Sequence, residues 1–206
     1  MKLYVAPYAP NPRRVAMFVS EKGIADLEVV SVNLQEGEHR SDAFRAKSPL
    51  SQIPMLELDD GRTLTESRAI CTYLEALYPD PNLMGRDAFE RAFVEMWDRR
   101  MELLFSMPLM MWVRHGNPVL AAVERNQNAE VAAYNQGQAM RMAKWLNGEL
   151  AAREWIAGDR FTIADITAAC GVDFAKMMRW RPGDELAHLR RWRQALAQRP
   201  AGAVAA

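Results

Sequence analysis

Short apolar runs near the start of the chain have the composition of β-strands. Leu3–Ala6 and Glu28–Leu34 are short, carry valine and aromatic residues, and are bounded by polar segments. Between them, Val15, Phe18 and Val19 follow the spacing of one face of a helix. The order of strand, helix and strand predicts a βαβ unit.

A second pair of strands follows. Met55–Leu58 and Arg62–Thr65 are separated by Asp59-Asp60-Gly61, which is a tight-turn signal, so this pattern predicts an antiparallel hairpin. The apolar residues of the next segment lie on one helical stripe. They are Ile70, Tyr73, Leu74, Leu77 and Tyr78. Together, these segments predict a small mixed sheet of four strands with helices packed on it.

A proline-rich segment ends this first pattern. Pro79 disfavours the helical conformation of Tyr78, and Pro79 and Pro81 remove two backbone donors. We therefore place a linker at residues 79–85, after a first domain at residues 1–78.

The rest of the chain lacks strand signals and carries long helical periods. We expect an all-helical second domain at residues 86–206, with a frayed tail at 201–206. The periodic segments lie at 86–115, 122–152, 162–180 and 185–198. The fold class is therefore α+β with two domains.

The most distinct local signal of the second domain is a helix start. Thr162 can cap the amide of Asp165, the Asp165 carboxylate can reach back, and Phe161 can pack on Ile166. We interpret Asp165 as a structural residue that starts a helix, and not as a catalytic acid.

Composition and charge exclude several classes of function. The 206 residues hold 26 Lys and Arg against 26 Asp and Glu, so a dedicated nucleic-acid binder is not expected. No apolar stretch approaches the roughly 20 residues that a membrane span needs, and the first residues lack the pattern of a signal peptide. We expect a cytoplasmic protein that binds neither nucleic acid nor membranes.

The cysteines are too few for a disulfide framework or a metal site. Cys71 and Cys170 are the only two, they lie far apart, and both are in apolar surroundings. We expect inert core cysteines and no metal. Thiol chemistry, if the protein performs it, would use the thiol of a ligand.

The motifs taken in order resemble the cytosolic glutathione transferases of bacterial type, and the resemblance spans nearly the whole chain. Near residues 8–15 there is a likeness to the nu-type relatives. The residues that carry the resemblance are Leu3-Tyr4, Pro10 to Val15, Glu21 to Ile24, Ser48 to Pro54, Asp59 to Gly61, Leu64 to Ile70, Tyr73-Leu74, and the helix start at 161–166.

This resemblance implies a thioredoxin-like first domain joined to a helical domain, in a homodimer. It implies that glutathione is the co-substrate, and that its thiolate attacks a small hydrophobic electrophile or a disulfide, as in detoxification. The activity implied is that of a glutathione transferase, and conjugation, peroxidase action and disulfide reduction all stay open. The alternative is a non-catalytic relative that uses the fold to bind a ligand or a protein.

Glu66 and Ser67 match the motif that holds the γ-glutamyl group of glutathione in this family. They stand where the last strand turns into a helix, so free amides and the helix dipole can hold a carboxylate. Ser67 would add a hydroxyl, and Glu66 would face the ammonium. The alternative is that Ser67 only caps the helix and Glu66 only complements its dipole.

The loop before the third strand resembles the family's site for the rest of glutathione. The resemblance implies that Pro54 is cis and that Ile53 pairs its backbone with the cysteinyl part. Gln52 is a candidate for the glycyl end, with an ordinary loop amide as the alternative. His39, with Arg40, lies where relatives often place a cation for the glycyl carboxylate, although we favour a solvated loop charge for either residue.

The group that activates the thiol departs from the family pattern, because Ala9 occupies the position of the usual hydroxyl or thiol. Asn11, as an N-cap before Pro12, is the first candidate, and it could donate its amide hydrogen to a thiolate or only cap the helix. Tyr8 is the second candidate, either as a donor or as a pocket wall. Arg13 and Arg14 are a third source of positive charge, although we expect solvated surface arginines there.

A methionine and tryptophan cluster is a candidate lining for the second substrate. It consists of Met107, Met110, Met111 and Trp112 around Pro108. Such side chains suit varied apolar electrophiles, but they equally suit a helix core or a subunit interface.

Overall fold

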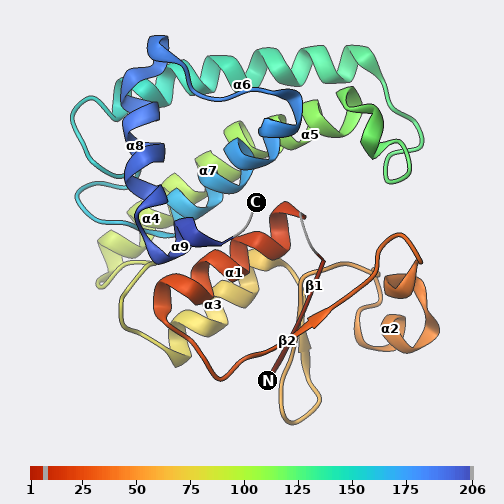
Figure 1. Cartoon of the computed structure of the whole chain (residues 1–206). Coiled ribbons are helices and arrows are strands. Elements are labelled where there is room, and N and C mark those ends of the chain that lie inside the picture. The colour runs from red at the N-terminus through yellow and green to blue at the C-terminus, as the bar shows by residue number, and fades with distance from the viewer. Residues whose placement is uncertain (7–8, 205–206) are drawn as a thin grey trace. The chain divides into compact units, whose positions relative to one another are not determined.

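A computed structural model describes residues 1–6 and 9–204 (Figure 1). These residues form two compact units: one holds residues 1–81 and 200–204, and the other holds residues 82–199. The fold class predicted from the sequence is confirmed, because the first unit carries a mixed four-stranded sheet and the second is helical.

The sheet of the first unit has the order β2-β1-β3-β4. β1 pairs with β2 in parallel, with Leu3 opposite Val29, and with β3 in antiparallel fashion, with Leu3 opposite Leu56. β3 and β4 form the predicted antiparallel hairpin. The strand bounds are β1 Lys2–Val5, β2 Glu28–Ser31, β3 Met55–Glu57 and β4 Thr63–Leu64. The βαβ unit and the hairpin are therefore confirmed, although the second strand is shorter than its valine run.

Helices cover both sides of this sheet. α1 and α3 pack against each other on one side of the strands, and α2 lies on the other side (Figure 1). The bounds are α1 Pro10–Lys22, the 3-10 turn Glu38–Arg40, α2 Asp42–Lys47 and α3 Ser67–Leu77. Gly23 ends α1 with a φ of 64°, a left-handed conformation that glycine adopts without steric cost. α1 follows β1 along the chain and α3 follows β4. The candidate site residues Asn11, Glu66 and Ser67 lie at the starts of these two helices.

The C-terminal segment departs from the prediction. We expected residues 200–206 to belong to the helical domain and to fray from 201, but α9, Pro200–Ala203, packs on α1 of the first unit. Arg13 Nη2 donates to the carbonyl of Val204 at 3.0 Å, and Ser20 Oγ donates to the carbonyl of Pro200 at 3.0 Å. These bonds satisfy carbonyls that an isolated tail would leave to water, which is why the segment is ordered.

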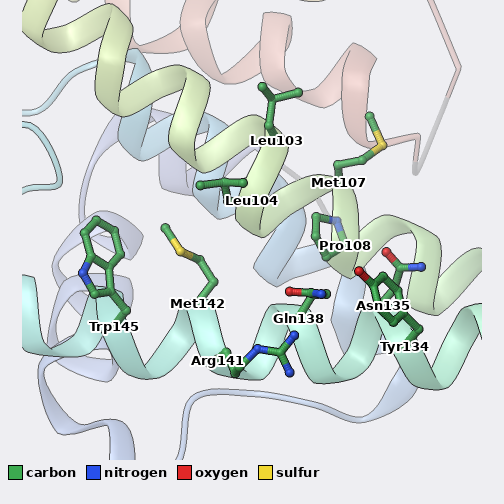
Figure 2. Close-up of a pocket in the computed structure, with 10 residues that line it drawn as sticks. All are labelled: Leu103, Leu104, Met107, Pro108, Tyr134, Asn135, Gln138, Arg141, Met142 and Trp145. Atoms are coloured by element: carbon green, nitrogen blue, oxygen red, sulfur yellow. The ribbon is translucent and has the colours of Figure 1, made fainter.

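The second unit is built from three helical segments that follow one another without a break and from three further long helices. The continuous segments are α4 Ala88–Arg100, the π-helix η2 Met101–Ser106 and α5 Met107–Gly116. α6 lies beside α5 and η2 (Figure 2), α7 packs on α4 and η2, and α8 packs on α6. The remaining bounds are 3-10 turns at Pro118–Leu120, Ala175–Met178 and Asp184–Leu186, and α6 Ala129–Glu149, α7 Ile163–Phe174 and α8 Ala187–Ala197. The four predicted helical segments are therefore confirmed.

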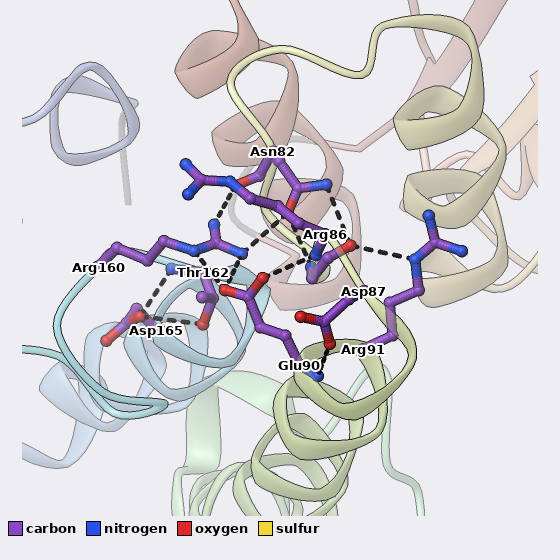
Figure 3. Close-up of polar contacts among 9 residues, drawn as sticks. Asn82, Arg86, Asp87, Glu90, Arg91, Arg160, Thr162 and Asp165 are labelled. Carbon is purple, nitrogen blue, oxygen red and sulfur yellow. Dashed lines mark hydrogen bonds and ion pairs between the residues drawn. The ribbon is translucent and has the colours of Figure 1, made fainter.

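Side chains tie the second half of the predicted linker to the helical unit (Figure 3). The amide of Gly85 donates to Asn82 Oδ1 at 2.8 Å, and Arg160 Nη2 donates to the same oxygen at 2.9 Å. Arg160 also pairs with Glu90 of α4 at 2.6 Å. The boundary between the units therefore falls at 81/82, inside the segment that we predicted as a linker.

The predicted helix start at Thr162 is a capping box (Figure 3). The buried Asp165 carboxylate accepts hydrogen bonds from the amides of Thr162 and Ile156, both at 2.9 Å, and from Trp192 Nε1 at 2.8 Å. Burial raises the pKa of Asp165 to about 6, against the lowering effect of these donors. One carboxylate thus joins α7, the turn before it and α8, which confirms a structural role.

Within residues 1–6 and 9–204, no helix combines the length and the hydropathy that crossing a bilayer requires.

Candidate functional site

Backbone strain marks the start of α3. Glu66 is the N-cap residue and has φ 63° and ψ 112°, a conformation that non-glycine residues adopt at a cost of roughly 1–3 kcal/mol. No side chain caps this helix, since Ser67 is its first residue. The interpretation of Ser67 as a simple helix cap is therefore wrong.

A buried arginine contacts Ser67. Arg14 of α1 is only 2% exposed, and its Nη1 donates to Ser67 Oγ at 3.1 Å. Because the serine oxygen accepts this bond, its own hydrogen is left to donate to a further acceptor. Our expectation of solvated surface arginines was wrong, since Arg13 is also only 8% exposed. The four-residue spacing from Arg14 to the buried Phe18 was the sequence signal that placed Arg14 on the inner face.

The start of α1 lies two residues earlier than the Asn11 cap that we predicted. The N-cap residue is Ala9, no side chain caps the helix, and Pro10 is its first residue. The amide of Arg13 already bonds to the carbonyl of Ala9 at 3.2 Å, which fixes this earlier start. Asn11 is therefore inside the first turn and exposed. It is also the only one of residues 10–12 with a backbone N–H, because both neighbours are prolines.

Tyr8, our second candidate for thiol activation, lies outside the described residues. Its role stays a prediction from the sequence.

The loop before β3 is held by a buried serine. Ser48 Oγ accepts from the amide of Gln52 and donates to the carbonyl of Gln52, both at 3.2 Å, while the Gln52 side chain is exposed. The Ile53-Pro54 peptide bond is cis, as the resemblance implied. Ile53 packs on the core cluster of Val32, Phe44 and Met55. Within the described part of the chain, its backbone N–H and C=O make no hydrogen bond, so a ligand peptide can pair with them.

His39 lies in the 3-10 turn before α2 and is half-buried. Burial, followed by the nearby Arg40 guanidinium, lowers the pKa of His39 below its usual value. The imidazole is therefore neutral at pH 7, whereas Arg40 is exposed and charged.

The two cysteines lie in the core of the chain. Cys71 and Cys170 are both buried, in agreement with the interpretation as core residues. Across residues 1–6 and 9–204, no three His, Cys, Asp or Glu side chains gather in a way that could hold a metal ion.

A pocket of about 590 Å³ lies in the helical unit, between η2 and α5 on one side and α6 on the other (Figure 2). From the predicted cluster only Met107, with the neighbouring Pro108, lines it. Met110 and Met111 do not line this pocket, and Trp112 is buried, which agrees with the alternative of a helix core for that residue. The other wall comes from α6, which the sequence pattern of α5 alone could not indicate.

Comparison with known proteins covers both units. The sequence matches the family description "Glutathione S-transferase, N-terminal domain" over residues 3–82 and "Glutathione S-transferase, C-terminal domain" over residues 110–200. Glutathione S-transferase 2 of Saccharomyces cerevisiae is 34% identical, over 97% of this chain and 87% of its own length. Glutathione S-transferase 3 of Zea mays is also 34% identical, over 98% of this chain and 90% of its own length.

Solved structures agree with these matches. A glutathione S-transferase domain-containing protein from Marinobacter aquaeolei has a TM-score of 0.91 and 38% identity, over 98% of this chain and 99% of that one. Gtt2 from Saccharomyces cerevisiae has a TM-score of 0.90 and 34% identity, over 98% of each chain. The likeness therefore extends over nearly the whole length of the protein.

Proposed function

We propose that this chain, which belongs to the glutathione S-transferase family, binds glutathione in its first unit and promotes attack of the glutathione thiolate on a hydrophobic electrophile or a disulfide. The observation that carries this proposal is the start of α3. There, Glu66 is strained, no side chain caps the helix, and the Ser67 oxygen accepts from a buried arginine. Strain of this kind persists where the surrounding structure maintains it for a function.

The γ-glutamyl group of glutathione carries a carboxylate and an ammonium, and the start of α3 suits both. The Ser67 hydroxyl and the first amides of α3 are donors for the carboxylate, and the helix dipole adds to the attraction. Arg14 supports this role because its bond to Ser67 Oγ directs the hydroxyl hydrogen away from itself. The exposed carboxylate of Glu66 has no partner within the described residues and suits the ammonium.

The rest of glutathione is proposed to extend along the loop before β3. The cysteinyl part would pair with the free backbone of Ile53, as a peptide adds to a sheet edge. Pro54 follows in the cis form. The exposed Gln52 amide and the turn that holds His39 and Arg40 are the candidates for the glycyl carboxylate.

Thiolate stabilisation is proposed to come from the start of α1 and not from a protein hydroxyl, because Ala9 has none. A helix N-terminus contributes about 0.3–1 kcal/mol to an adjacent anion, and up to about 2 kcal/mol in favourable geometry. Since one pKa unit corresponds to about 1.36 kcal/mol, the helix end alone lowers a thiol pKa by at most about 1.5 units. The exposed amide of Asn11 and the phenol of Tyr8 are the side-chain donors proposed to add to this effect.

Asn11→Ala tests this account of activation. A hydrogen bond to a charged group contributes about 1.5 kcal/mol, so its loss should raise the pKa of the bound thiol by about one unit. We expect up to about a tenfold slower turnover at pH 6.5, with little change in KM for glutathione. A pH profile of kcat with an aromatic electrophile measures this shift.

Asn11→Asp is the matched control, since it keeps the size of the side chain but places an anion beside the thiolate. It should raise the thiol pKa further than Asn11→Ala does. If Asn11→Ala and Tyr8→Phe each leave the profile unchanged, the activation account is wrong even if the enzyme is active.

The lowered pKa of His39 predicts that Arg40, and not His39, is the cation in the turn Glu38–Arg40 that attracts the glycyl carboxylate at neutral pH. At pH 7.5 His39→Gln should leave the Kd of glutathione within about twofold, while Arg40→Gln should weaken it by up to about fivefold, as for an exposed ion pair. As the pH falls through the lowered pKa, the imidazole gains charge, so His39→Gln should bind less tightly than wild type only in acid. Calorimetry between pH 5 and 8 follows both variants, and a large loss for His39→Gln at pH 7.5 would contradict this assignment.

A second candidate function follows from Ala9. With no hydroxyl or thiol at that position, the chain could be a non-catalytic family member that binds a ligand or a protein. Turnover with a generic aromatic electrophile, or with a glutathione disulfide, favours the enzyme. Binding of glutathione without either reaction favours the second candidate.

We propose the family's homodimeric assembly and a cytoplasmic location for this chain as well. Both follow from the family resemblance and stand as proposals beside the glutathione site.

A further inference from the structure

The last described residues of the chain pack along α1. Residues 200–204, which we call the C-terminal strap, contain α9, and α9 packs on α1 within the first unit. Ser20 Oγ donates to the carbonyl of Pro200 at 3.0 Å. The amide of Ala201, a fully buried residue, donates to Glu21 Oε2 at 3.3 Å. The beginning of the strap is therefore fixed to the last turn of α1.

The end of the strap reaches the first turn of α1. Arg13 is only 8% exposed, and its Nη2 donates to the carbonyl of Val204 at 3.0 Å. Ser20 and Glu21 follow Arg13 by seven and eight residues, so all three side chains lie on one face of α1. The strap thus runs along this face from the end of the helix back to its start, where thiolate stabilisation is proposed.

The first turn of α1 has little support of its own. Among the residues that the structure describes, no side chain caps the helix, and Pro10 and Pro12 supply no backbone N–H. Helix ends with few hydrogen bonds open locally at a low free energy. The bond between Arg13 and Val204 holds this turn from outside, two residues from Asn11.

We propose that the C-terminal strap positions the start of α1 for thiolate stabilisation, by holding Arg13 and with it the first helical turn. This inference rests on the proposed function and extends it to a carbonyl that is 191 residues from Arg13 in the sequence. Arg13 acts through the helix, because a closed first turn makes the helix dipole and the amide of Asn11 available to the thiolate. Glutathione would still be held at the start of α3 and at the loop before β3. Loss of the strap should therefore raise the thiol pKa and leave binding of the protonated thiol unchanged.

Ala201→Asp tests the inference, because it places a buried carboxylate next to Glu21 and so detaches the strap. Ultraviolet difference spectra of bound glutathione should show a thiol pKa raised by about one unit, since the helix end supplies at most about 1.5 units. Calorimetry at pH 5.5, where the thiol is protonated, should give a Kd within about twofold of wild type. Hydrogen exchange of the amides in residues 9–13 should become at least about tenfold faster, as loss of a bond from a charged donor predicts.

A chain that ends at Arg199 lacks the strap altogether and should give the same three results. Ala203→Asp is the matched control, because it adds the same charge to the same short helix at an exposed residue. It should keep the thiol pKa and the exchange rates of wild type.

The inference is overturned, with the proposed function intact, if wild type lowers the thiol pKa and both strap variants lower it equally. It is also overturned if Ala203→Asp raises the thiol pKa as much as Ala201→Asp does. A loss of stability without a change in thiol pKa, which a purely structural strap would give, contradicts it as well. A wild type that binds no glutathione overturns the proposed function and this inference together.

Discussion

Replacing Glu66 and Ser67 together with alanine is expected to abolish detectable glutathione binding. Each side chain is proposed to contact a charged group of the γ-glutamyl moiety, and hydrogen bonds to charged groups contribute about 1.5–3 kcal/mol each. Loss of both should raise the Kd by at least about a hundredfold. Isothermal calorimetry at pH 7 with the purified variant measures this change, and an unchanged affinity would contradict the site assignment.

Two further variants separate binding from helix capping. Ser41 caps α2 by accepting from the amide of Phe44 at 3.2 Å, so Ser41→Ala removes a serine at a helix start in the same unit. It should lower stability by about 1 kcal/mol and leave glutathione affinity unchanged. Glu66→Gly should instead stabilise the fold, since glycine adopts a positive φ without strain, while it weakens glutathione binding. That opposite change in stability and affinity is the signature of a strained binding residue.

Replacing Asp165 with alanine is expected to cost about 3–5 kcal/mol of stability. The change leaves the amides of Ile156 and Thr162 and the indole N–H of Trp192 buried without an acceptor. For a chain of this size, that loss lowers the Tm by roughly 10 °C or more. Urea unfolding at pH 7 followed by tryptophan fluorescence measures it.

The matched control is Asp87→Ala. Asp87 caps α4 by accepting from the amide of Glu90 at 2.8 Å, but this cap is exposed to solvent. It should cost only about 1 kcal/mol. Equal costs for Asp87→Ala and Asp165→Ala would contradict the role assigned to the buried carboxylate.

The pKa of Asp165 adds a pH dependence to this prediction. Burial raises it to about 6 from an ordinary value of 3.8, so the folded chain keeps the proton that the unfolded chain releases between these values. The contribution of Asp165 is therefore largest below about pH 4 and falls as the pH rises to about 6. Asp165→Asn, which does not titrate, should lack this component of the stability curve.

The sequence predicted those strands, turns and helix starts that are specified by a few neighbouring residues. The valine run at 28–34 and the turn at Asp59-Asp60-Gly61 specify the strands, because alternation and turn chemistry act over a few residues. The capping box at Thr162 and Asp165 was readable for the same reason. α2 escaped detection because six residues are too few to show a helical period.

The features that depend on contacts between distant residues were not readable. Residues 10–12 offered two prolines that each fit the first position of a helix, and only the bond from Arg13 to Ala9 decides between them. The spacing of Arg14 from Phe18 indicated its burial, but its hydrogen bond to Ser67, which is 53 residues away, was not readable. The pocket depends on α6 lying beside η2, so no property of the α5 sequence could give its second wall.

The sequence placed Glu66 and Ser67 where the last strand turns into a helix, and α3 begins there in the structure. The motif pointed to Glu66 and Ser67, yet the pattern also allowed a simple helix cap. The observed φ of Glu66 and the absence of any side-chain cap on α3 remove that alternative. Backbone conformation at one residue, which composition does not encode, was the missing information.

The most direct test of the central proposal is the ultraviolet difference spectrum of glutathione bound to the purified chain between pH 5 and 9. The account predicts saturable binding and a thiolate band that develops well below about 8.5, the pKa of an unperturbed thiol. Absence of saturable binding, or a band that appears only at the pKa of free glutathione, would contradict it.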